Sequence, residues 1–126
     1  MSGWALINFE DIETGGPEGS PVDVRFARKH LDSAELGVSR FRYPANAKFP
    51  FGHRHREQEE AYVVVSGGGR VKLDNEIIDI KVGDVVRVSP EVVRGFAAGP
   101  DGLEMICIGG HKPEGGDGEL VQDFWP

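Results

Sequence analysis

Short segments in which apolar and polar residues alternate follow one another along most of the chain. Residues 22–26 read Val-Asp-Val-Arg-Phe, and residues 70–73 read Arg-Val-Lys-Leu. Successive side chains of a β-strand point to opposite faces, so this alternation predicts strands with one buried face. We expect strands at residues 22–26, 36–43, 60–66, 70–74, 76–80, 84–88, 92–97 and 103–108, and Trp4–Ile12 is a candidate edge strand.

Turn-forming residues separate these segments. Asp74-Asn75 lies between two alternating segments, and both residue types tolerate the positive φ that tight hairpins require. Gly67–Gly69, Gly83-Asp84 and Gly99–Gly102 are further expected turns, and we find no long helical period. Many short strands joined by tight turns predict an all-β fold. An antiparallel β-sandwich or jelly-roll barrel is favoured, since one open sheet would leave long unpaired edges.

Chain length and net charge exclude several classes of protein. The 126 residues favour a single domain over 1–126, with its core at about 36–108 between an N-terminal strand and a C-terminal tail. The formal net charge of -7 argues against a nucleic-acid partner, which requires clustered Lys and Arg. No apolar run approaches the ~20 residues of a membrane span. The N-terminus also lacks the pattern of a signal peptide. We therefore expect a cytoplasmic protein with no membrane partner.

One cysteine, Cys107, lies among apolar residues. It has no second cysteine with which to form an intramolecular disulfide, and its neighbours indicate an inert core thiol.

The candidate chemistry lies between residues 53 and 60. His53 and His55 are two residues apart, so on a strand both imidazoles face the same side. Glu60 follows five residues later, where a predicted strand begins. Two imidazoles and one carboxylate can bind Fe, Mn, Ni or Zn, and with open positions they form the facial triad of non-haem iron enzymes. Alone, a His-x-His pair is also compatible with a solvated surface.

The wider spacing resembles the cupin family. That family's first motif has His-x-His, three or four residues, Glu, six residues and Gly, and here His53, His55, Glu60 and Gly67 match it. A second stretch, Gly83–Val88 followed by Pro90, resembles the second motif. The resemblance implies a jelly-roll barrel with His53, His55 and Glu60 as metal ligands. It implies little about the reaction, because one fold hosts many chemistries.

Position 94 departs from the family pattern. The resemblance places a fourth ligand, a histidine, where this chain has Arg94, and a guanidinium donates no lone pair to a metal. In one interpretation three ligands hold the metal and Arg94 binds an anionic group of a ligand. In the other interpretation no metal binds and Arg94 pairs with Glu60. Tyr62 shares the strand face of Glu60 and is a second candidate ligand-binding residue.

Three functional hypotheses remain open. The first is a metal-dependent oxygenase or isomerase acting on a small anionic molecule, with a divalent transition metal (Fe, Mn, Ni or Zn). The second is a metal-free, non-catalytic barrel that binds or senses a small molecule, and the third is a partner-binding domain. The resemblance also implies a homodimer, for which the Trp4 segment and Phe124-Trp125 are candidate contacts.

Overall fold

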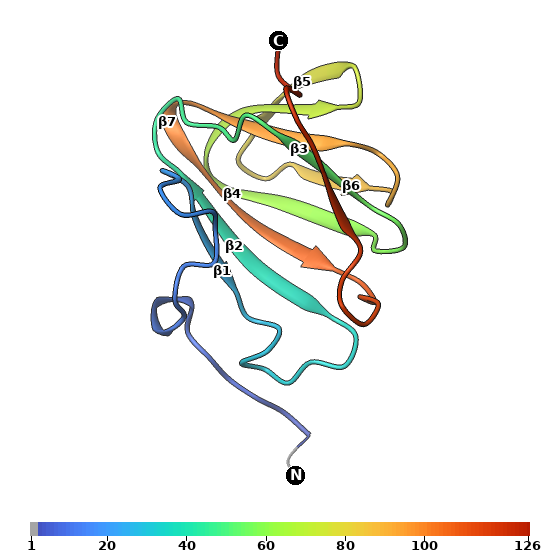
Figure 1. The fold of residues 1–126 in the computed structure, drawn as a ribbon. Coiled ribbons are helices and arrows are strands. Elements are labelled where there is room, and N and C mark those ends of the chain that lie inside the picture. The colour runs from blue at the N-terminus through green and yellow to red at the C-terminus, as the bar shows by residue number, and fades with distance from the viewer. Residues whose placement is uncertain (1–2) are drawn as a thin grey trace.

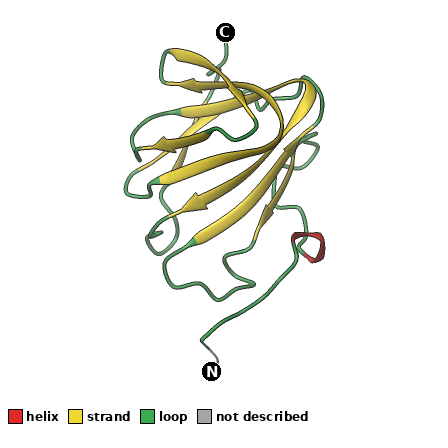
Figure 2. Cartoon of the chain, turned by 180° about the vertical axis from the view of Figure 1, so that it is seen from behind, coloured by secondary structure: helices red, strands yellow, loops and turns green. Residues whose placement is uncertain are grey.

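The computed structural model describes residues 3–126, and almost all regular structure in this part of the chain is β-strand (Figures 1 and 2). Within it, helix is limited to one 3-10 turn, η1 (Phe9–Asp11), and no helix has the length and hydropathy needed to cross a bilayer. The all-β prediction is confirmed. The strands are β1 (Asp23–Phe26), β2 (Gly37–Tyr43), β3 (Gly52–His55), β4 (Glu60–Leu73), β5 (Glu76–Lys81), β6 (Val85–Val88), β7 (Arg94–Gly109) and β8 (Gly118–Val121).

Two long strands, β4 and β7, pass from one layer of the fold into the other (Figure 1). The first part of β4 pairs with β6 and with the second part of β7, and β2 and β1 continue this layer. The second part of β4 pairs with β5 and with the first part of β7, and β3 and β8 continue the other layer. All pairs are antiparallel, which gives a curled antiparallel sheet of the jelly-roll type.

Glycines allow β4 to cross between the layers beside β7. Gly67 has φ +72°, and a Cβ there would lie 2.1 Å from the carbonyl oxygen of Gly102. A Cβ on Gly69 would lie 2.0 Å from the carbonyl oxygen of Ala97. Both positions exclude any side chain, so the two backbones approach closely only because these residues are glycine.

The turns predicted at residues 67–69 and 99–102 are therefore wrong. Both segments lie inside continuous strands, and the pairing of β4 with β7 shifts register at residues 64–66 and 67–69. Here the glycines permit a bulged crossing of the strands between the two layers, and the chain does not reverse direction. The hairpin at Asp74-Asn75 is confirmed, because Leu73 pairs with Glu76 and Asp74 has φ 52°.

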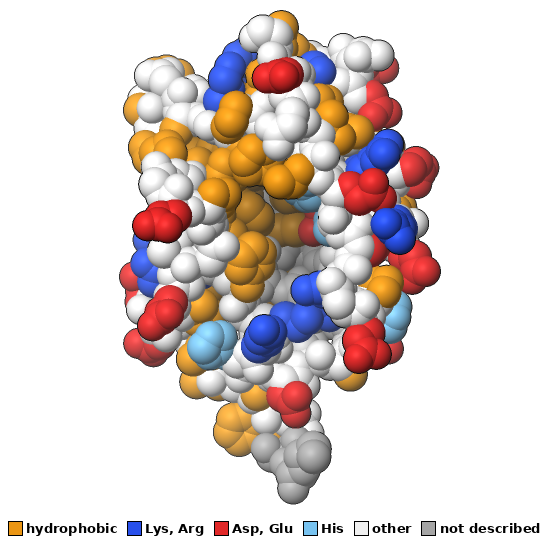
Figure 3. All heavy atoms as spheres, in the orientation of Figure 1, with side chains coloured by type: hydrophobic (Ala, Val, Ile, Leu, Met, Phe, Trp, Pro, Cys, Tyr) orange, Lys and Arg blue, Asp and Glu red, His pale blue; other side chains and the backbone are white. Residues whose placement is uncertain are grey.

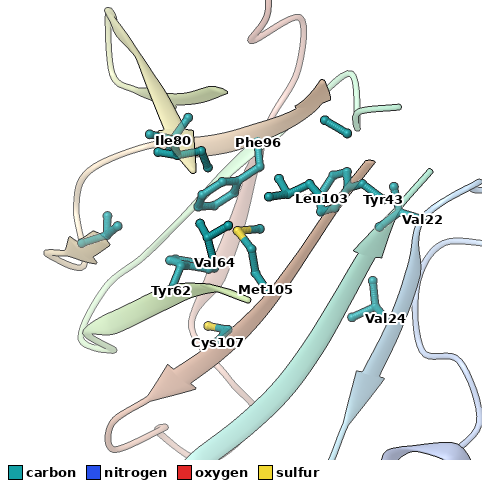
Figure 4. Packing of buried hydrophobic residues seen from close by; sticks show 13 residues of the cluster. Val22, Val24, Tyr43, Tyr62, Val64, Ile80, Phe96, Leu103, Met105 and Cys107 are labelled. Carbon is teal, nitrogen blue, oxygen red and sulfur yellow. The ribbon is translucent and has the colours of Figure 1, made fainter. Parts of the chain in front are cut away.

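Alternate residues of the long strands form the core between the layers (Figure 4). On β4, Tyr62 and Val64 are buried, and on β7 the same holds for Met105 and Cys107. Full burial of a large apolar side chain contributes about 1.5–3 kcal/mol, so this alternation accounts for much of the driving force. The core also includes Val22, Val24, Tyr43, Val71, Ile80, Val88, Phe96, Ala98 and Leu103.

The N-terminal strand predicted within Trp4–Ile12 is wrong, because within residues 3–22 the structure has no strand. This segment is held by side chains and not by strand pairing. The Arg25 guanidinium donates to the carbonyl of Ile12 at 2.9 Å, and Arg40 pairs with Glu10 at 2.9 Å. These contacts occupy polar groups that an edge strand would present to a neighbour.

The C-terminal tail packs on its own barrel. β8 pairs with β3, and Phe124 is buried where two glycines leave room for its ring. A Cβ on Gly52 would lie 2.6 Å from that ring, and one on Gly95 would lie 3.1 Å from it. Phe124 is therefore not an exposed dimer anchor, which corrects that expectation. Trp4 is exposed, and the homodimer itself stays a prediction.

Candidate metal centre

Strand β3 carries both histidines of the predicted site. His53 pairs with Arg94 at the start of β7, and the backbone N–H of His55 donates to the carbonyl of Pro90 at 2.8 Å. On its other side β3 pairs with β8 along its whole length. The tail therefore fixes the strand that presents both imidazoles.

Side chains from the two layers meet in the interior. The Nε2 atom of His53 lies 3.4 Å from Oε1 of Glu60 on β4, and Nε2 of His55 lies 3.4 Å from the same oxygen. One donor atom from each of the three residues lies within 4.8 Å of the others. The convergence expected from the spacing is present, and this donor set could hold a metal ion.

The tail also supplies a partner for His55. The Asp117 carboxylate lies 2.9 Å from Nδ1 of His55 and accepts the backbone N–H groups of Glu57 at 2.7 Å and Gln58 at 2.9 Å. Burial alone would raise the pKa of Asp117. The hydrogen bonds from Glu57, His55 and Gln58 outweigh burial and lower that pKa to about 2.

This contact sets the state of the His55 ring. With Nδ1–H donating to Asp117, the lone pair of the neutral ring lies on Nε2, which points toward Glu60. Nε2 is buried and has no hydrogen-bond partner among the described residues. A buried acceptor without a partner costs free energy, and a bound cation removes that cost.

Glu60 is the centre of the cluster. The Tyr62 hydroxyl donates to it, and the Cys107 thiol lies 3.4 Å from Oε2. Burial would raise the pKa of Glu60, but the His53 and His55 imidazoles beside it and the hydrogen bond from Tyr62 hold that pKa well below its ordinary range. Burial also raises the pKa values of Tyr62 and Cys107. The site therefore contains one carboxylate and two neutral donors, and Cys107 contacts the site as well as the core.

Arg94 is fully buried beside Glu60, as expected for an inward-facing residue at this position. Its Nη1 atom donates to the carbonyls of Val92 at 2.8 Å and Pro90 at 3.2 Å. Its Nη2 atom lies 3.6 Å from Oε1 of Glu60. The ion pair offsets the cost of burying both charges. Nη2 and Nε form no hydrogen bond with the residues described.

The cluster borders a cavity of about 1160 Å³, which opens on the face shown in Figure 3. The cavity is slightly larger than the ~300–1,000 Å³ typical of small-molecule sites, so a small organic molecule has room in it. His53, His55, Glu60, Tyr62 and Arg94 all line it. Five aromatic side chains form part of its wall: Phe41, Tyr43, Phe49, Phe51 and Phe96.

Sequence reasoning missed two residues of the site. Asp117 follows Gly115-Gly116 in a segment of loop-like composition, where an aspartate carries no distinctive signal. Cys107 has the pattern of a core residue, and only its cross-strand pairing with Tyr62 brings it to Glu60.

A two-layer antiparallel jelly roll with a His-His-Glu set between its layers defines a small barrel protein with an interior site. Residues 39–109 match the cupin domain model, and the chain belongs to the cupin family. The uncharacterized protein MJ1618 of Methanocaldococcus jannaschii is 38% identical over 56 residues, which are 44% of this chain and 45% of that protein. The match thus spans less than half of that relative's length.

Solved structures support the same assignment. A cupin protein from Bacteroides fragilis superposes with a TM-score of 0.66 at 27% identity, over 82% of this chain and 86% of that one. Oxalate decarboxylase from Lactobacillus farciminis, in a formate complex, superposes with a TM-score of 0.72 at 18% identity, over 83% of this chain and 32% of that one. At that identity the second likeness shows the fold alone.

Proposed function

We propose that His53, His55 and Glu60 bind a divalent transition metal, and that this centre binds a small anionic molecule in the barrel. The observation that carries the proposal is the buried Nε2 of His55, which Asp117 orients and which has no hydrogen-bond partner among the described residues. Its neighbours are the donor types that Fe, Mn, Ni and Zn prefer. When bound, such an ion supplies Lewis acidity and coordination positions open to a ligand.

The charge of the site supports an anionic ligand. Glu60 and Arg94 offset each other, the histidines are neutral ligands and the Asp117 carboxylate beside His55 carries one negative charge, so a divalent ion leaves a buried charge of about +1, which is costly without a counter-ion. Arg94, with N–H groups unused among the residues described, and Tyr62 are the proposed ligand-binding residues. The catalytic form of this proposal is an oxygenase or isomerase acting on that anion.

One observation favours a second candidate, a metal-free barrel that binds or senses a small molecule. Nη2 of Arg94 lies 3.6 Å from Oε1 of Glu60, so the guanidinium compensates the carboxylate without any metal. The two candidates differ in one measurable property, which is the affinity of the chelator-treated protein for divalent ions.

Isothermal titration calorimetry with Ni²⁺, Mn²⁺ and Zn²⁺ on chelator-treated protein tests the proposal. We expect binding of one ion per chain, lost in H55A. The matched control is H111A, because His111 is exposed and pairs with Glu35 at 3.1 Å, outside the cluster. Binding that survives in H55A would place the ion elsewhere, and no binding to the parent protein would favour the metal-free barrel; either result would contradict the proposed centre.

A further inference from the structure

The arginines of this acidic protein are paired with carboxylates almost throughout. Within residues 3–126, two arginines lack a carboxylate within 4.0 Å. One is Arg70, which lies over the Trp125 ring at 5.6 Å. The other is Arg28, which lines the cavity. The arginines with a carboxylate partner are Arg25, Arg40, Arg42, Arg54, Arg56, Arg87 and Arg94.

Arg28 is held in one orientation by the backbone. Its Nη1 atom donates to the carbonyl of Glu35 at 3.0 Å, and its Nη2 atom donates to the carbonyl of Gly110 at 3.0 Å. The guanidinium lies against Gly37, where a Cβ would be 2.5 Å from Nη2. These neutral acceptors fix the group without cancelling its charge, which leaves a preorganised cation at the cavity.

Two lysines extend this positive edge. Lys29 follows Arg28, and Lys112 lies two residues beyond Gly110; both are exposed and line the same cavity. Neither has a carboxylate partner among the residues described. Figure 3 shows Lys and Arg side chains gathered along one edge of the hollow, with apolar side chains over the opposite wall. We call Arg28, Lys29 and Lys112 the basic edge. Asp11 and Glu13 of the N-terminal segment also line the cavity, so the positive charge belongs to this edge and not to the whole lining.

The cavity thus has cationic groups at the basic edge, the His53, His55 and Glu60 cluster at a second place, and aromatic side chains on part of its wall. We propose that its ligand is an elongated dianion with an apolar body. One anionic group lies at the His53, His55 and Glu60 cluster, which rests on the function proposed above. A second carboxylate or a phosphate-type group lies at the basic edge. Phe41, Phe49 and Phe96 line the space in which the apolar body packs.

Calorimetric titration with matched probes tests this inference. The probes are linear dicarboxylates of four to ten carbons, the monocarboxylates of equal length, and 8-phosphonooctanoate. At low ionic strength we expect the best dianion to bind about tenfold more tightly than its monocarboxylate. An exposed ion pair contributes a factor of about 2 to 5, and the basic edge offers more than one. This advantage falls as salt is added. A larger advantage for the phosphonate than for the dicarboxylate of equal length identifies a phosphate-type group at the edge.

The variant K29E/K112E reverses two charges and leaves the backbone contacts of Arg28 in place. We expect it to lose the preference for dianions and to bind Ni²⁺ like the parent. R28Q is the second variant, and K81A is the control because Lys81 is exposed and outside the cavity lining. A preference that survives in both basic-edge variants overturns the inference. So does equal affinity for dianion and monocarboxylate, or no binding of any probe to the parent. Failure of the parent to bind Ni²⁺ is a separate result that refutes the proposed metal centre.

Discussion

Asp117 connects the tail to the candidate metal centre, and Asp117→Asn removes its charge. The substitution preserves shape, but it turns one of the two acceptor oxygens, Oδ1 facing His55 or Oδ2 facing Glu57 and Gln58, into an NH2 donor. The folded protein lowers the pKa of Asp117 from 3.8 to about 2. One pKa unit corresponds to about 1.4 kcal/mol, so the ionised carboxylate contributes about 2 kcal/mol to the free energy of unfolding.

The direction of this pKa shift determines how the stability of the protein changes with pH. Because the pKa is lower in the folded chain, the stabilisation is fully present above the unfolded pKa of 3.8 and is lost as the pH falls toward about 2. The free energy of unfolding of metal-free D117N should therefore be about 2 kcal/mol lower than that of the parent at neutral pH. The difference from the parent should narrow by about this amount as the pH falls toward the folded pKa.

Urea unfolding with a chelator present, repeated from neutral to acid pH, measures this difference directly. D101N is the control, because Asp101 is exposed and accepts no hydrogen bond from the described side chains; a surface change of this kind shifts stability by less than about 0.5 kcal/mol. A gap that stays constant with pH, or no gap at neutral pH, would refute the reasoning. The affinity of D117N for Ni²⁺ should also fall about 10- to 100-fold, since His55 loses its orienting partner.

Three further substitutions probe the site and the fold. R94H places an imidazole beside Glu60 and should bind Ni²⁺ more tightly than the parent by calorimetry; equal affinity would mean that an imidazole at position 94 does not reach the bound ion. G69A should lower the free energy of unfolding in urea by at least about 3 kcal/mol, because its Cβ would lie 2.0 Å from the Ala97 carbonyl oxygen. The control is G110A, whose Cβ would meet no atom closer than 3.8 Å and which should be as stable as the parent. F124A should lower the free energy of unfolding by about 3 kcal/mol in thermal unfolding. A decrease of less than about 1 kcal/mol would mean that the tail is not docked between Gly52 and Gly95.

The strands were predictable because their alternation is local, but the crossings were not. Gly67 has φ +72°, a conformation found both in hairpin turns and in bulged crossings. A glycine at this position is therefore compatible with either structure. Only the approach of β7, which brings the Gly102 carbonyl to this position, distinguishes the two. The strand expected within Trp4–Ile12 failed for a similar reason, since Arg25 takes up its carbonyl groups from a distant segment.

The same contrast between local sequence patterns and contacts with distant segments applies to the site. His53, His55 and Glu60 lie within one short segment with a recognisable spacing, so sequence alone predicted their convergence. Asp117 is 62 residues from His55 and reaches it only because β8 pairs with β3. Such a partner becomes visible when the fold places the two strands side by side.

X-ray absorption at the zinc edge of the Zn²⁺-loaded protein tests the central claim most directly. We expect nitrogen and oxygen donors at about 2.0–2.2 Å, together with the outer-shell scattering of two imidazoles. A sulfur donor at about 2.3 Å would place the ion on Cys107, and a spectrum without imidazole scattering would place it away from β3. Either result would contradict a metal centre formed by His53, His55 and Glu60.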